Sequence, residues 1–167
     1  MKILFPMMML ISMITNKDNT NLIHNTCKNT PYYQLCFSTL QSDPRSTSDA
    51  DIAVLGLVMV DAVTKKTVEI MDSIKELEKT NPEWIVPLSE CSMFYYAVLK
   101  ADVPEAIAGL KKGVPKFAEM GMEDAAVEAE TCEYSLKENG LNSPLSEKNT
   151  EIMDLSAVAK SIIRMLL

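Results

Sequence analysis

Residues 48–80 read SDADIAVLGLVMVDAVTKKTVEIMDSIKELEKT, and the spacing of their apolar side chains decides the fold class. These side chains recur at three- and four-residue steps, which is typical of a long amphipathic helix with one face in a core. They are Ile52, Leu55, Met59, Val63, Ile70, Ile74 and Leu77. Ser48 is a suitable N-cap, Asp49 and Asp51 favour the helix dipole, and Asn81-Pro82 stops the helix. The stretch predicts one long helix that starts at Ser48.

Three more helical stretches follow. The second runs from about Trp84 to Lys112, with an interruption just before Pro104, and ends at Gly113. The third covers about Phe117 to Glu138. The fourth starts near Pro144, and its apolar face holds Leu145, Ile152, Leu155, Ala159, Ile162 and Leu166. Long helices joined by short loops, with few alternating runs, predict an all-α fold, an antiparallel up-down four-helix bundle over about residues 48–167.

A smaller helical unit precedes the bundle, at about residues 21–41. One helical turn covers Leu22 to Lys28, and Thr30-Pro31 is a good start for a second helix that reaches Leu40. These two segments carry Cys27 and Cys36, so a bridge between them would tie two short helices into a hairpin.

The N-terminus has the pattern of a secretory leader. Lys2 is followed by an uncharged apolar run over residues 3–15 that is too short to span a bilayer and is interrupted by Pro6. We expect a signal peptide over residues 1–19, cut between residues 15 and 20. The remaining residues, 20–167, predict one domain. A net charge of −7 argues against nucleic-acid binding, which needs a basic face.

Four cysteines behind a secretory leader indicate a disulfide framework. They are Cys27, Cys36, Cys91 and Cys132, and they allow three pairings between which the sequence does not choose. The pairs Cys27–Cys36 and Cys91–Cys132 are the simplest, because they close one local hairpin and one loop across the bundle. The spacing fits no zinc signature.

Residues suited to catalysis are few. His24 is the one histidine, and we expect it to lie at the surface or to pack in the hairpin. A single histidine cannot supply the two Glu-x-x-His pairs of a di-iron bundle. The carboxylates Glu119, Glu123, Asp124, Glu128 and Glu130 are interpreted as a solvated helix face. We therefore expect no enzyme activity, no cofactor and no metal.

The segment Gly113-Val-Pro-Lys-Phe117 links the second and third helices. Pro115 would stiffen this loop, Lys116 would offer a cation on a long stem, and Phe117 an apolar anchor for an acidic pocket. A structural interpretation competes with this one, in which Pro115 breaks the helix, Lys116 faces water and Phe117 covers the core.

The chain resembles the plant invertase inhibitors, in the family they share with the pectin methylesterase inhibitors. The matching stretches run through most of the predicted domain. They are CKNTPYYQLC at 27–36, LGLVMVDAV at 55–63, PLSEC at 87–91 with Tyr95, PKFAE at 115–119, ETCE at 130–133 and VAKSIIRMLL at 158–167. The resemblance implies bridges Cys27–Cys36 and Cys91–Cys132, and a four-helix bundle with an N-terminal helical hairpin.

The resemblance also implies a role for Pro115, Lys116 and Phe117, which would enter the substrate cleft of an acid invertase in a 1:1 complex. Such a cleft holds a carboxylate pair that cleaves the glycosidic bond, and Lys116 would place a cation beside it. The expected location is the vacuole or the cell wall. The alternatives are a pectin methylesterase inhibitor on the same fold, a carrier of an apolar ligand, and an enzyme.

Overall fold

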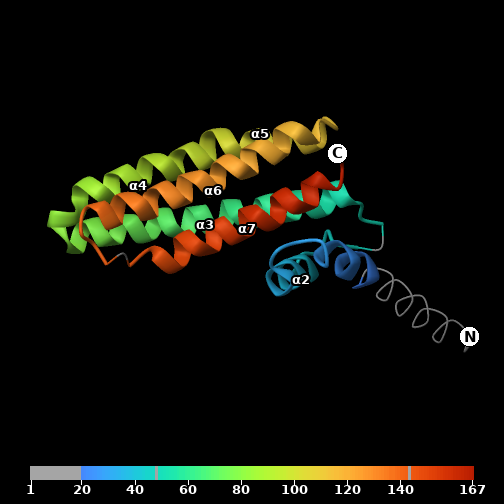
Figure 1. The fold of residues 1–167 in the computed structure, drawn as a ribbon, viewed down its shortest axis with the longest axis horizontal. Coiled ribbons are helices and arrows are strands. Elements are labelled where there is room, and N and C mark those ends of the chain that lie inside the picture. Colours follow the sequence, from blue (N-terminus) through green and yellow to red (C-terminus); the bar gives the residue numbers. More distant parts are fainter. Residues whose placement is uncertain (1–19, 48, 143) are drawn as a thin grey trace, which may run out of the picture.

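The computed structural model describes residues 20–47, 49–142 and 144–167, and the expected signal peptide, residues 1–19, lies outside them. Long helical segments run side by side in alternating directions (Figure 1). They are α3 (Ile52–Thr80), α4 (Ile85–Ala97) continued by α5 (Val103–Lys111), α6 (Pro115–Glu138) and α7 (Ser146–Arg164). The prediction of an all-α antiparallel four-helix bundle is confirmed.

Helix α3 begins at Ile52, so its N-cap lies three residues after the predicted Ser48. The carboxylate of Asp51 accepts a hydrogen bond from the Val54 backbone N–H at 2.8 Å, and Asp51 is therefore the N-cap. Ser48 itself lies outside the described residues. The helix ends at Thr80, and Pro82 opens a short 3₁₀ turn, η1 (Pro82–Trp84), that leads into α4.

The interruption expected before Pro104 is a π-helical turn, η2 (Val98–Asp102), between α4 and α5. Proline has no N–H for the helical ladder and its ring crowds the preceding turn, which a wider turn relieves. This arrangement lets η2 approach α6 closely at Gly121, where any Cβ would overlap the carbonyl oxygen of Asp102.

The predicted apolar stripes form the core. Leu55, Met59, Val63, Ile70 and Ile74 of α3 are fully buried, and Ile52 and Leu77 pack against them half-buried. On α7 the buried side chains include Leu155, Ala159 and Ile162, with Leu145 just before the helix. The prediction fails at Leu166, which is exposed because α7 ends two residues earlier, at Arg164.

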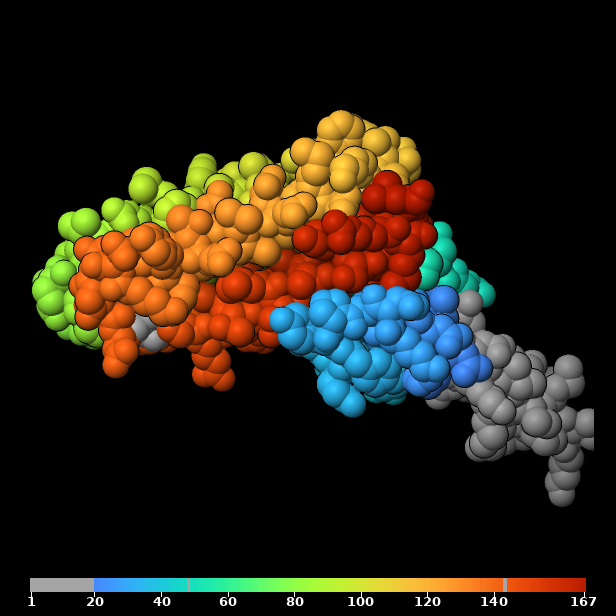
Figure 2. Space-filling model, viewed as in Figure 1, coloured from blue at the N-terminus to red at the C-terminus, as the bar shows by residue number. Residues whose placement is uncertain are grey.

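The N-terminal unit is a hairpin of helical residues 20–27 and α2 (Tyr33–Ser42), and it packs against α3 and α7 (Figures 1 and 2). Helix α2 starts two residues after the predicted Pro31, because the hydroxyl of Thr30 bonds back to the Cys27 carbonyl and does not cap α2. His24 packs edge-on against the Tyr33 ring, with centroids 5.8 Å apart. Within the described residues no helix has both the length and the apolar character needed to cross a bilayer.

Candidate functional site

Pro115, Lys116 and Phe117 do not form a loop, which corrects the sequence interpretation. They are the first three residues of α6, and the connection from α5 is only Lys112–Val114. Gly113 has a φ of 68°, a left-handed conformation that suits glycine after a helix. Proline is favoured at the first helical position because its missing N–H is not needed there. The three residues are therefore held by a helix.

Lys116 and Phe117 project from this first turn into solvent. The Lys116 side chain is 64% exposed and its Nζ lies 2.7 Å from Oε2 of Glu119, one turn further along α6. Phe117 is 51% exposed, so it does not cover the core as the structural interpretation supposed. The end of the α5–α6 pair thus presents a cation and an aromatic ring side by side.

Glu119 lies beneath Lys116 and is only 2% exposed. Its Oε1 accepts a hydrogen bond from Nε of Arg164, at the end of α7, and the two side chains form an ion pair. The interpretation of this carboxylate as part of a solvated helix face is wrong, because α7 covers it. Hydrogen bonds from Lys116 and Arg164 outweigh burial and hold the pKa of Glu119 below its usual value. One buried carboxylate thus binds two cations from two helices.

Sequence reasoning missed the pairing of Glu119 with Arg164. The three-residue step from Lys116 to Glu119 places both side chains on one helix face, a signal that was readable. Arg164 lies 45 residues further on, and only the packing of α7 along α6 brings it to the same carboxylate.

The cysteines form the two bridges that the resemblance implied. Cys27 is bonded to Cys36 within the hairpin, and Cys91 of α4 is bonded to Cys132 of α6. All four are fully buried, and none of the described cysteines is free. They therefore hold helices together and offer no thiolate.

Beside the second bridge lies a buried polar network. The Tyr95 hydroxyl donates to Oδ1 of Asn149 at 2.5 Å, and Asn149 Nδ2 donates to Oε2 of Glu133 at 2.7 Å. Burial and the charge of Glu133 raise the pKa of Tyr95 above its usual range. Tyr95 and Asn149 are fully buried, so a substrate has no access to them. The network joins α4, α6 and α7 and has a structural role.

Asp102, at the end of η2, is a buried acid that the sequence gave no reason to select. It is 7% exposed, and within the described part of the chain its Oδ2 has no hydrogen-bond partner. Burial, with the charges of Asp124, Glu128 and Glu105, raises the pKa of Asp102 to about 6. No group of three or more histidine, cysteine, aspartate or glutamate side chains in the described ranges could hold a metal.

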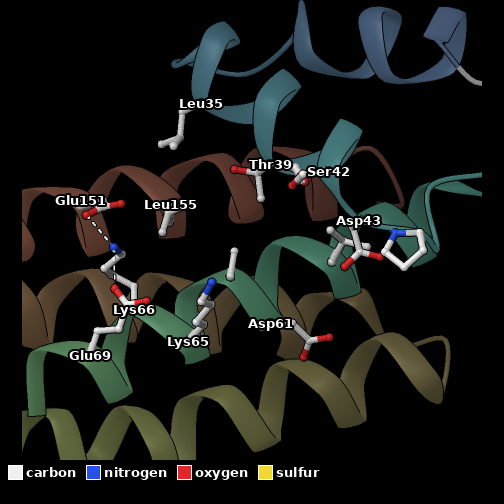
Figure 3. A pocket seen from close by; sticks show the side chains of 13 residues that line it. Leu35, Thr39, Ser42, Asp43, Asp61, Lys65, Lys66, Glu69, Glu151 and Leu155 are labelled. Atoms are coloured by element: carbon white, nitrogen blue, oxygen red, sulfur yellow. Dashed lines mark hydrogen bonds and ion pairs between the residues drawn. The ribbon is translucent and has the colours of Figure 1, made fainter. Parts of the chain in front are cut away.

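A groove of about 400 Å³ lies between α2 of the hairpin and helices α3 and α7 of the bundle (Figure 3). Leu35 and Thr39 of α2 face Leu155 of α7 across it. Its charges are largely paired with one another. Lys66 Nζ lies 2.8 Å from Glu69 and 3.0 Å from Glu151, and the nearby Arg45 joins Asp43 to Asp61. These pairs fasten the hairpin to α3 and link α3 to α7, so the groove is interpreted as a structural seam.

Comparison with known proteins places this geometry in a family. The family model for "Plant invertase/pectin methylesterase inhibitor" matches residues 21–162. The chain is 42% identical over 142 residues to the "Cell wall / vacuolar inhibitor of fructosidase 1" of Arabidopsis thaliana, covering 85% of this chain and 67% of that protein. It is 48% identical to the corresponding inhibitor 2 of the same plant over 50 residues, 29% of this chain and 27% of that protein.

The fold has a solved counterpart as well. A crystal structure of a mutant form of a pectin methylesterase inhibitor from Arabidopsis superposes with a TM-score of 0.70, over 84% of this chain and 94% of that one. The two sequences are 19% identical, so this likeness concerns the fold alone.

Proposed function

Because this chain belongs to the plant invertase/pectin methylesterase inhibitor family, as an inhibitor rather than an enzyme, we propose that it inhibits an acid invertase. In this proposal Lys116 and Phe117 enter the substrate cleft of one invertase molecule in a 1:1 complex, with Pro115 behind them. The relative named a cell wall/vacuolar inhibitor of fructosidase supports the choice of target and suggests one of those two locations. The observation that carries the proposal is the exposed pair at the start of α6.

The chemistry of the target explains why a cation is presented there. A glycosidase cleaves its substrate with two carboxyl groups, so its cleft is acidic and shaped for a neutral sugar. A lysine ammonium would bind beside those carboxylates and exclude the sugar. Lys116 can leave Glu119 without losing its own solvation, because its side chain is 64% exposed, although the carboxylate that it leaves is buried. Glu119 would remain paired with Arg164, and no buried carboxylate would be left without a cation.

The helical setting favours binding. Helix α6 fixes the backbone of all three residues before the complex forms, so little conformational entropy is lost on docking. The half-exposed ring of Phe117 supplies apolar area that the enzyme would cover. A preformed turn of helix thus replaces the proline-stiffened loop that the sequence suggested.

Inhibition of pectin methylesterase is the second candidate, since the solved counterpart carries that name and the fold is shared. The Pro-Lys-Phe sequence at 115–117 favours invertase. An apolar-ligand carrier would need a cavity inside the bundle, whereas the stripes of α3 and α7 are packed together in the core. The groove in Figure 3 lies between the hairpin and the bundle and is rimmed by charges.

The test is inhibition of acid invertase by the oxidised protein and by the variants Lys116→Ala and Lys79→Ala. Lys79 is a matched control, because it is 68% exposed and its Nζ also lies 2.7 Å from a glutamate three residues away, Glu76. We expect Lys116→Ala to lose about 2–5 kcal/mol of affinity and Lys79→Ala to keep full inhibition.

Equal inhibition by both variants would overturn the role of Lys116 and leave the target in place. If the unaltered protein does not inhibit invertase, the invertase proposal is wrong. The same samples are then assayed against pectin methylesterase, and inhibition there would establish the second candidate.

A further inference from the structure

Exposed apolar side chains gather around Phe117 at one end of the bundle. Val114 immediately precedes α6, Phe117 and Met120 belong to its start, and Met165, Leu166 and Leu167 follow the end of α7. We call these six residues the tip patch; their side chains are between 37% and 66% exposed. In Figure 2 the red end of α7 lies against the orange-yellow start of α6. The two halves of the patch are therefore neighbours in space.

The ion pair between Arg164 and Glu119 fixes the two halves relative to each other. Beyond Arg164 the backbone continues in turns, with Met165 N–H bonded to the Ile162 carbonyl at 3.0 Å and Leu166 N–H to that of Ile163 at 3.0 Å. Leu167 N–H bonds to the Arg164 carbonyl at 3.2 Å. Residues 165–167 are thus held in position while their apolar side chains face solvent, an arrangement that gains nothing for the isolated fold.

The surroundings of the tip patch differ in charge from the rest of the protein. Residues 111–120 and 164–167 hold the cations Lys111, Lys112, Lys116 and Arg164 against one carboxylate, Glu119, although the chain as a whole carries −7. A surface both apolar and basic fits an acidic partner with apolar walls. It does not fit a second copy of itself, because the four cations would face four more.

We propose that Met165, Leu166 and Leu167 form a second contact with the invertase, against the rim of the cleft that receives Lys116 and Phe117. This inference rests on the proposed function and adds to it a segment from another helix. The Arg164–Glu119 pair joins the two contacts into one rigid surface, so the enzyme covers both at once. The acidic cleft takes the cation, and the rim takes the apolar residues.

The test compares two triple variants of the full chain. One carries Met165→Ser, Leu166→Ser and Leu167→Ser. The control carries Ile85→Ser, Val86→Ser and Met93→Ser, which alters three exposed apolar side chains of α4. We expect the 165–167 variant to bind invertase about tenfold more weakly, as loss of an anchoring contact does, and the control to bind like the unaltered protein. Circular dichroism checks that both are folded.

Hydrogen exchange on the unaltered protein gives an independent readout, in which the amides of residues 165–167 become protected when invertase binds. Two outcomes overturn the inference. In the first, the 165–167 variant binds invertase with full affinity while Lys116→Ala loses inhibition. The second contact would then be wrong, although the proposed function would stand. The other is a dimer of the unaltered protein in sedimentation that these serines dissociate, because the tip patch would then bind a second copy.

Discussion

The two ends of helix α6 both hold a carboxylate against α7, but they surround it with different groups. At the start, Glu119 is bound by two exposed cations, Lys116 and Arg164. Near the other end, Glu133 accepts from the neutral groups of Ser146, at 2.6 Å, and Asn149, at 2.7 Å. The exposed Lys137 lies 3.2 Å from Glu133 on the solvent side.

This difference separates stability from recognition. The partners of Glu133 lead inward, to the buried Tyr95 and the Cys91–Cys132 bridge, and they join α4, α6 and α7. The partners of Glu119 lead outward, to a cation beside the exposed Phe117. The groups that stabilise the fold, such as Tyr95 and Asn149, are buried. The groups proposed to bind the enzyme, Lys116 and Phe117, are exposed to solvent.

The largest expected effect on stability is at the Glu133 end of α6, which we call the closed end because the polar network there is buried. The double substitution Cys91→Ser and Cys132→Ser opens a loop of 41 residues and should lower the free energy of unfolding by about 3–4 kcal/mol. Urea unfolding measures it. The matched pair Cys27→Ser and Cys36→Ser opens a loop of 9 residues and should cost about 2–3 kcal/mol. A larger loss from the hairpin pair would contradict the assignment of stability to the closed end.

The next largest effect on stability is expected at Asp102, which ends η2 and packs against α6 at Gly121. Its folded-state pKa of about 6 lies above the ordinary 3.8, so the folded protein binds the extra proton. This stabilisation is complete below pH 3.8 and is lost as the pH rises through 6. Asp102→Asn should remove on the order of 2–3 kcal/mol of that pH dependence and should stabilise the protein at neutral pH.

Unfolding by urea at several pH values tests this, with the exposed Asp72→Asn as control. If Asp102→Asn keeps the pH dependence of the unaltered protein, the buried acid is not its source. Among the described residues, the charges that raise the pKa of Asp102 are all acidic: Asp124 and Glu128 from α6 and Glu105 from α5.

The sequence could predict features that depend on residues close together in the chain, but not those that depend on contacts between distant helices. The period of apolar residues on α3 and the proline at position 104 act within a few turns, and the bundle and the π-helical interruption follow from them. The first turn of α6 was also within reach, since proline favours the first helical position. The burial of Glu119 and Asp102 was not, because it depends on α7 and α6 packing over them. The candidate site at Glu119 therefore depends on contacts between residues far apart in the sequence, such as the pair with Arg164.

The smallest expected change in stability is that of Glu119→Gln, which sharpens the comparison because Glu133→Gln can be measured beside it. Loss of the charge weakens two ion pairs whose cations remain solvated, at a cost of about 1 kcal/mol. The lowered pKa of Glu119 sets the pH range. The stabilisation is present above the ordinary value of 4.5 and is lost as the pH falls through the lower folded-state pKa. The variant and the unaltered protein should therefore converge in acid.

Inhibition distinguishes the two glutamine variants more sharply than stability does. Glu119→Gln weakens the pair with Arg164 that joins the two parts of the proposed enzyme contact, so binding to invertase should weaken. Glu133→Gln disturbs only the closed end and should leave binding unchanged in protein that is still folded. Binding titrations of both variants decide the point. Equal affinities would mean that Glu119 serves the fold alone, as Glu133 does.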